Sequence, residues 1–206
     1  IKEGEKATWN RVTWSGNTTT HDHVIIRSLR TKPGNLFSKL DIKRTYFDLA
    51  GMQFFDPQQI GQDIQPNQQD NTVDVHWTLV EKGSSQVQLQ AGYGGNSFIG
   101  TLGLTFNNFS LRNFLKLKDF KPVPQGDGQM LSVQVQAGQY FKNYSLSFTE
   151  PWLFGNRPTA LSVSLNQSMV NYKDYTGASQ KLNIFSASAG LNRLLNWPDN
   201  YFSLYT

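Results

Sequence analysis

The segment Gln86-Val87-Gln88-Leu89-Gln90-Ala91-Gly92-Tyr93 alternates polar and apolar residues without interruption, and it decides the fold class. A period of two residues places the apolar side chains on one face of a β-strand and the polar side chains on the other. The same alternation predicts six further strands downstream, at residues 98–106, 131–137, 144–149, 161–166, 185–191 and 201–206. We therefore expect this part of the chain to form antiparallel strands.

The polar positions of these strands distinguish between two kinds of sheet. They hold Gln, Ser, Thr, Asn and Gly with almost no charge. A soluble sheet normally carries more Lys and Glu on its solvent face, whereas the lumen of a membrane barrel is wet and polar. Aromatic residues at the predicted strand ends fit the girdles of such a barrel: Tyr93, Phe98, Phe141, Tyr144, Trp152 and Phe154. The pattern favours a transmembrane β-barrel over the alternative, a soluble Greek-key sandwich or barrel.

Composition excludes several other classes of protein. The 206 residues include no Cys, so disulfides, thiolate zinc sites and cysteine nucleophiles are excluded. No apolar run approaches the ~18 residues that a transmembrane helix requires. The net charge is +4, but the basic residues of the second part are scattered apart from Lys116, Lys118 and Lys121, so we expect no nucleic-acid binding. The chain begins at Ile1 without a signal-peptide pattern and stops within a predicted strand, so we expect a piece of a longer protein.

Residues 1–81 predict a small α+β domain in the order strand–helix–helix–strand–strand. The expected strands are residues 8–14, 59–65 and 72–80, and the expected helices are residues 21–29 and about 38–49. Thr20 or Asp22 is available as the N-cap of the first helix. The second helix offers a set of apolar residues for its buried face: Leu40, Ile42, Tyr46, Phe47 and Leu49.

This order of elements carries three motifs of a known family. Gly16-Asn17-Thr18, Pro33-Gly34-Asn35-Leu36-Phe37 and Gly51-Met52-Gln53-Phe54-Phe55 follow one another as in a POTRA domain, which the segment resembles. POTRA domains are the periplasmic modules of BamA-type outer-membrane assembly factors. The alternative is another small ferredoxin-like α+β domain.

Two downstream segments extend the resemblance. Asn107 to Phe114 resembles the first periplasmic turn of a BamA barrel, and the stretch from Phe148 to Asn156 resembles the turn after the fourth strand. Within the latter, Glu150-Pro151-Trp152 forms the family-motif turn, and Pro151 suits a strand end because it cannot donate to the ladder. An insert at Leu115–Gly128 departs from the family pattern and has no role that the sequence assigns.

The resemblance implies a domain plan and a location. Residues 1–81 would be the last POTRA domain, in the periplasm, and residues 82–206 the N-terminal portion of a barrel in the bacterial outer membrane. About seven of the sixteen strands of the family's barrel would then be present. The implied partners are unfolded outer-membrane proteins, accessory assembly lipoproteins and outer-membrane lipid.

The resemblance also implies a function at two strand edges. In the family the first barrel strand, here Gln86 to Tyr93, pairs weakly with the last and forms a lateral gate. We expect client proteins to add a strand to this edge without ATP, the alternative being a sealed seam. A second edge lies in the POTRA domain and comprises Gln59, Ile60, Gly61, Gln62, Asp63 and Ile64. The resemblance implies that this edge guides clients or docks accessory lipoproteins. The alternative is that the domain is only a spacer. Competing functions are a two-partner secretion or translocation pore and a soluble β-rich binding protein.

The sequence offers no catalytic constellation. Glu150 is a lone carboxylate rather than half of an acid–base pair. His21 and His23 lie two residues apart at the start of a predicted helix, so their side chains are expected to diverge by ~200°. His76 is expected on a solvated strand face. We expect no metal site, no cofactor and no enzymatic activity.

Overall fold

The computed structural model describes residues 6–94, 97–114, 123–155, 158–173, 175–195, 197 and 202–206. It divides into two compact units, one reaching Ser84 and including Gln125–Asp127, the other holding the remainder. Several residues in the sequence-based predictions lie outside the described residues: residues 115–122 of the insert with its three lysines, Asn156 and Tyr201.

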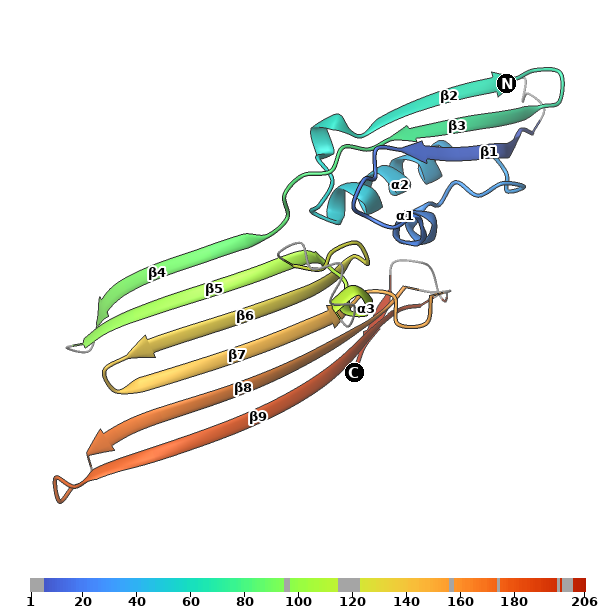
Figure 1. The fold of residues 1–206 in the computed structure, drawn as a ribbon. Helices are drawn as coiled ribbons and strands as arrows, with labels where there is room; N and C mark the ends of the chain where they lie inside the picture. The colour runs from blue at the N-terminus through green and yellow to red at the C-terminus, as the bar shows by residue number, and fades with distance from the viewer. Residues whose placement is uncertain are drawn as a thin grey trace. The chain divides into compact units, whose positions relative to one another are not determined.

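The first unit has the element order that the sequence predicted (Figure 1). Its strand β3 is central, pairing in parallel with β1 and antiparallel with β2. Among the described residues, no helix is both long and apolar enough to cross a membrane. The elements are β1 (Thr8–Ser15), α1 (Asp22–Ser28), α2 (Lys39–Gly51), the short 3-10 helix η1 (Pro57–Gln59), β2 (Gly61–Asn67) and β3 (Thr72–Thr78).

The core of this unit lies between the sheet and the two helices. Alternate residues of β3, Val73, Val75 and Trp77, are buried, so they point to the same face of the sheet. They belong to one apolar cluster with α1 and α2, which therefore cover that face. The other members of the cluster are Trp9, Val24, Ile25, Leu29, Ile42, Leu49, Phe54, Phe55 and Leu79.

The helices differ in detail from the prediction. His21, not Thr20 or Asp22, is the N-cap residue of α1, with extended backbone at φ −70° and ψ 146°. In α2 the buried residues are Ile42, Thr45 and Leu49, a narrow stripe at helical spacing. Leu40 is 51% exposed and Phe47 59% exposed, so the expectation that both are buried was wrong.

The edge strand β2 begins two residues later than expected. Gln59 ends the 3-10 helix, which Asp56 caps by accepting a hydrogen bond from the Gln58 backbone and which has Pro57 at its start. Ile60 lies between this helix and the strand. The assignment of Gln59 and Ile60 to the edge strand was therefore wrong, while Gly61 to Ile64 lie in β2. The strand includes Pro66, which an edge strand tolerates because one side of its ladder is unpaired.

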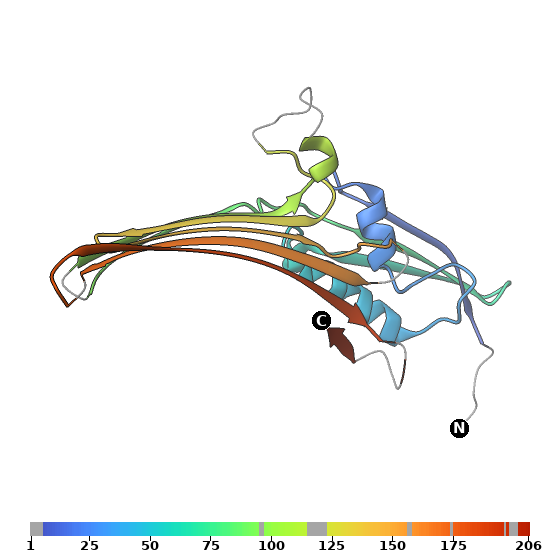
Figure 2. The ribbon, with the colours of Figure 1, turned by 90° about the horizontal axis from the view of Figure 1, so that it is seen from below.

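The second unit is an open seven-stranded sheet in the order β10-β9-β8-β7-β6-β5-β4. Every neighbouring pair is antiparallel, and the long strands curve together along their length (Figure 2). The elements are β4 (Gln86–Gly94), β5 (Ser97–Phe109), α3 (Leu111–Phe114), β6 (Gln129–Gly138), β7 (Phe141–Glu150), β8 (Thr159–Lys173), β9 (Ser179–Leu194) and β10 (Ser203–Tyr205).

In the register of this sheet, apolar residues lie opposite apolar residues and polar residues opposite polar residues from β4 to β9. One row of directly opposed residues is apolar: Val87, Leu104, Val133, Leu146, Leu165 and Ala187. The adjacent row is polar or glycine: Gln88, Gly103, Gln134, Ser145, Asn166 and Ser186. Hydroxyls on the polar face bond across strands, as between Ser164 and Ser188 at 2.7 Å. An apolar face opposite an uncharged polar face is the pattern of membrane barrel strands, and the open sheet corresponds to part of such a barrel.

Candidate functional site

Strand β4 forms one edge of the seven-stranded sheet. Among the described strands it pairs only with β5, in an uninterrupted register from Gln86 opposite Thr105 to Gly94 opposite Ser97. The sequence-predicted residues 86–93 therefore all lie in one edge strand. The outer edge of such a strand presents a row of backbone N–H and C=O groups that can pair with another chain.

The surroundings of β4 are open. Val87 is 68% exposed and Leu89 76% exposed on the apolar face. A Cβ atom added at Gly92 would meet nothing within 4 Å, so this glycine is not required by close packing and it lowers the strand propensity of the edge. A shallow groove runs beside the strand and is lined by Leu89, Gln90, Ala91, Gly92, Tyr93, Ile99, Thr101 and Gln136.

Strand β2 is an edge of the three-stranded sheet. Its pairing with β3 runs without a shift from Gly61 opposite Thr78 to Asn67 opposite Thr72. A mainly apolar groove lies between β2 and α2, and two lysines border it. The residues that line this groove are Phe37, Lys39, Ile42, Lys43, Tyr46, Gln62 and Ile64.

The family-motif turn is held by one carboxylate. Strand β7 ends at Glu150, directly before Pro151, as the proline predicted. Glu150 accepts hydrogen bonds from Gln129 Nε2 at 2.7 Å and from the backbone N–H of Trp152 at 3.0 Å. Gln129 in turn accepts from the Leu111 backbone at 2.6 Å, so the turn after β7 is tied to the start of α3. The expected turn at residues 107–114 instead consists of the end of β5 and α3.

Three donors meet the carboxylate of Glu81. These are the Thr18 hydroxyl at 2.7 Å and the backbone N–H groups of Thr19 at 2.8 Å and Thr20 at 2.6 Å. Burial alone would raise the pKa of Glu81, but the hydrogen bonds from Thr20, Thr18 and Thr19 outweigh burial and hold the pKa below its ordinary value. The ionised carboxylate thus anchors the loop that precedes α1.

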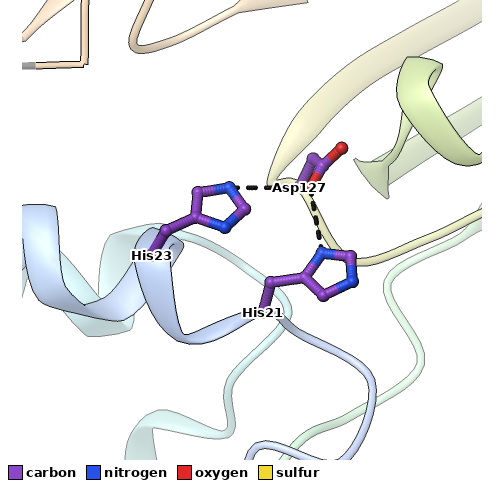
Figure 3. A group of neighbouring side chains, drawn as sticks. All are labelled: His21, His23 and Asp127. Atoms are coloured by element: carbon purple, nitrogen blue, oxygen red, sulfur yellow. Dashed lines mark hydrogen bonds and ion pairs between the residues drawn. The ribbon is translucent and has the colours of Figure 1, made fainter.

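Two histidines converge on a buried aspartate, which the sequence did not predict (Figure 3). His21 Nδ1 lies 2.9 Å and His23 Nε2 lies 3.5 Å from Asp127 Oδ1. The two rings are stacked with centroids 5.7 Å apart, so the expectation that they diverge was wrong. The physical reason is that His21 has extended N-cap backbone, and helical rotation does not apply to it. His76 lies elsewhere, between the hydroxyls of Thr13 and Ser15.

Comparison with known families and proteins gives consistent results. Residues 7–82 match the POTRA family, described as a surface antigen variable number repeat, and residues 125–205 match the Omp85 superfamily domain. A Treponema pallidum (strain Nichols) protein provisionally named an outer membrane protein assembly factor is 26% identical over 157 residues, covering 76% of this chain. The outer membrane protein assembly factor BamA of Nitratidesulfovibrio vulgaris is 24% identical over 151 residues, covering 73% of this chain.

This chain spans 17% of the length of each of these two relatives. Among solved structures, BamA from Haemophilus ducreyi lacking POTRA domains 1–3 aligns with a TM-score of 0.68 at 19% identity, over 92% of this chain and 33% of that one. CdiB from Acinetobacter baumannii aligns with a TM-score of 0.57 at 15% identity, over 93% of this chain and 34% of that one. Both structures share the fold described above.

Proposed function

We propose that the parent protein of this chain, which belongs to the Omp85 superfamily and is of the BamA type, assembles β-barrel proteins into the outer membrane. Its POTRA domain lies in the periplasm. In this proposal the process needs no catalytic group and no cofactor. Client strands pair with the outer edge of β4, and hydrogen bonding to that edge guides their folding in the membrane.

The edge of β4 is the observation that carries the proposal. A strand that enters a bilayer must satisfy its backbone hydrogen bonds, because unpaired N–H and C=O groups cost several kcal/mol each in hydrocarbon. A nine-residue edge strand, β4, supplies such partners over a length suited to a membrane strand of ~9–11 residues. The glycine at position 92 keeps that pairing weak enough to be exchanged.

The groove between β2 and α2 supports a second contribution, in which β2 receives an extended client segment or an accessory lipoprotein before the membrane step. Backbone pairing along β2 would provide affinity, and the apolar lining with Phe37, Ile42 and Ile64 would accept alternate side chains. If β2 is only a spacer, Ile64→Lys will not change client binding to the parent protein at temperatures where the POTRA domain is folded; the Tm is measured as well, because Ile64 also packs against the apolar cluster. If it receives clients, the substitution will weaken binding, while Gln65→Lys, on the neighbouring exposed position, will not.

Reconstitution tests the main proposal. The parent protein is placed in lipid vesicles, a urea-unfolded outer-membrane barrel protein is added, and folding is followed by the heat-modifiable band on a cold detergent gel. We expect faster client folding than in vesicles without the parent protein. Equal folding rates would contradict the proposal. Transfer of the client across the membrane without insertion would instead favour a two-partner secretion pore.

A further inference from the structure

We propose that His21, His23 and Asp127 form a binding site for a divalent transition-metal ion, with Zn²⁺ as the ion that fits best. The site is independent of the two strand edges. All three residues belong to the same compact unit, although Asp127 lies 106 residues beyond His21 in the sequence. Its three potential ligand atoms all lie within 4.8 Å of one another.

The distances suit a shared ion after a small side-chain adjustment. Zn²⁺ binds histidine nitrogen at ~2.0–2.1 Å and carboxylate oxygen at ~2.0–2.2 Å, so tetrahedral ligand atoms lie ~3.4 Å apart. Here Asp127 Oδ1 is 2.9 Å from His21 Nδ1 and 3.5 Å from His23 Nε2. The histidine side chains are 46% and 44% exposed, which leaves room for their rings to rotate and for an ion to enter.

Hydrogen bonds from the α1 region to the backbone around Asp127 hold the carboxylate in place. Its side chain is only 7% exposed, and Arg27 donates to the Asp127 backbone carbonyl at 3.1 Å. On the preceding residue, the Gly126 carbonyl accepts from the His21 backbone N–H at 2.9 Å. A Cβ atom at Gly126 would lie 2.8 Å from His21 Cε1, and the residue has φ +123°, so glycine permits this close approach. The backbone therefore positions the aspartate against the histidines.

The donor set selects the kind of ion. Two imidazole nitrogens and one carboxylate oxygen suit Zn²⁺ and neighbouring transition metals, whereas Ca²⁺ and Mg²⁺ prefer oxygen ligands alone. Three protein ligands leave a position for water or an additional ligand, as in many Zn²⁺ sites. The histidines and Asp127 are far apart in the sequence and meet only in the folded unit. A bound ion would therefore stabilise that unit against unfolding.

Metal titration of the parent protein in detergent tests the site. The metal-stripped protein is titrated with Zn²⁺ by calorimetry and with Co²⁺ by visible absorption, and the Tm is measured with and without Zn²⁺. We compare wild type with Asp127→Asn, which keeps the side-chain size, and with His21→Ala. The matched control is His76→Ala, since His76 is the third histidine of the 206 residues and lies outside the cluster.

We expect wild type and His76→Ala to bind one more equivalent of Zn²⁺ than His21→Ala. In Asp127→Asn the Kd should rise by more than the ~10–100-fold that loss of an outer-shell partner costs. The rise in Tm on addition of Zn²⁺ should be absent in both Asp127→Asn and His21→Ala. The Tm of the first unit without metal checks that each variant is folded. Equal stoichiometry and affinity in wild type, Asp127→Asn and His21→Ala would overturn the proposal, as would the absence of micromolar binding in wild type.

Discussion

The backbone of Gly16 lies against the carbonyl oxygen of Leu79, so closely that a Cβ atom on residue 16 would be 1.8 Å from that oxygen. Gly16 also has φ +96°, and the Leu79 N–H donates to the Ser15 carbonyl at 2.8 Å. The first motif of the POTRA domain is thus a point where two chain segments meet with no space for a side chain.

We expect Gly16→Ala to destabilise the POTRA domain more than Gly34→Ala. Both residues have positive φ, and the strained backbone of an L-residue costs ~1–3 kcal/mol at either position. A Cβ at Gly34 meets nothing within 4 Å, so only Gly16→Ala adds a clash with backbone. Chemical denaturation monitored in the POTRA domain of the parent protein measures the difference. Equal losses of stability in the two variants would show that the close approach to Leu79 does not matter.

The lowered pKa of Glu81 predicts a pH dependence. Since its folded pKa lies below the ordinary value of 4.5, the ionised carboxylate stabilises the fold above that pH, and this contribution is lost as the pH falls through the lowered pKa. We expect the Tm of wild type to fall more between about pH 6 and about pH 3 than that of Glu81→Gln. The comparison with Glu81→Gln isolates the contribution of this one carboxylate. Parallel Tm curves for the two proteins would contradict this role for Glu81.

Helix α2 offers a paired test of its buried stripe. Leu49 is fully buried, so Leu49→Ala should cost ~2–5 kcal/mol of unfolding free energy. Leu40→Ala on the same helix should change stability by less than ~0.5 kcal/mol, because Leu40 is largely exposed. Urea denaturation measures both. A large loss at Leu40 would mean that a partner covers it in the parent protein.

The turn after β7 depends on the Glu150 carboxylate. In Glu150→Ala, Gln129 Nε2 and the Trp152 N–H lose their acceptor, which costs ~1–3 kcal/mol for a buried donor. We expect the heat-modifiable band of the parent protein to be lost at a lower temperature. Glu150→Gln keeps an acceptor oxygen and should lie between Glu150→Ala and wild type. Unchanged behaviour in both variants would contradict the anchoring role.

Sequence reasoning predicted the elements best where a period was long and regular. The unbroken alternation in Gln86 to Tyr93 identified β4 closely, and Pro151 marked the end of β7. The sequence underestimated the lengths of β8 and β9. The alternation of apolar and polar residues becomes irregular toward the ends of these strands, so the pattern identified only their middle parts. The start of β2 was misjudged because Asp56 and Pro57 form a 3-10 cap, which residue period does not reveal.

The histidine–aspartate cluster could not be predicted from the sequence. A helical wheel assumes that both histidines have helical backbone, yet His21 is an N-cap residue. Asp127 lies in the insert to which the sequence assigned no role, and only the tertiary fold brings it to His21. Gly126, the residue before it, approaches the His21 segment closely in the fold, but a glycine in the sequence does not identify the segment that it meets.

The central claim is that client strands add to the edge of β4. Gln88 on β4 and Gln134 on β6 form a matched pair, because both lie directly opposite Gly103 on β5. Strand β6 also pairs with β7, whereas the other edge of β4 has no partner among the described strands. Each is replaced by Cys in the parent protein and tested for disulfide formation with single-Cys variants along a strand of a folding client. Gln90→Cys is tested against the same series.

We predict crosslinks from position 88 and none from position 134. When the Cys moves from position 88 to 90, the client residue that crosslinks should also shift by two, because paired strands keep a fixed register. Equal crosslinking from 88 and 134, or crosslinks from β4 without any register, would contradict strand addition at this edge.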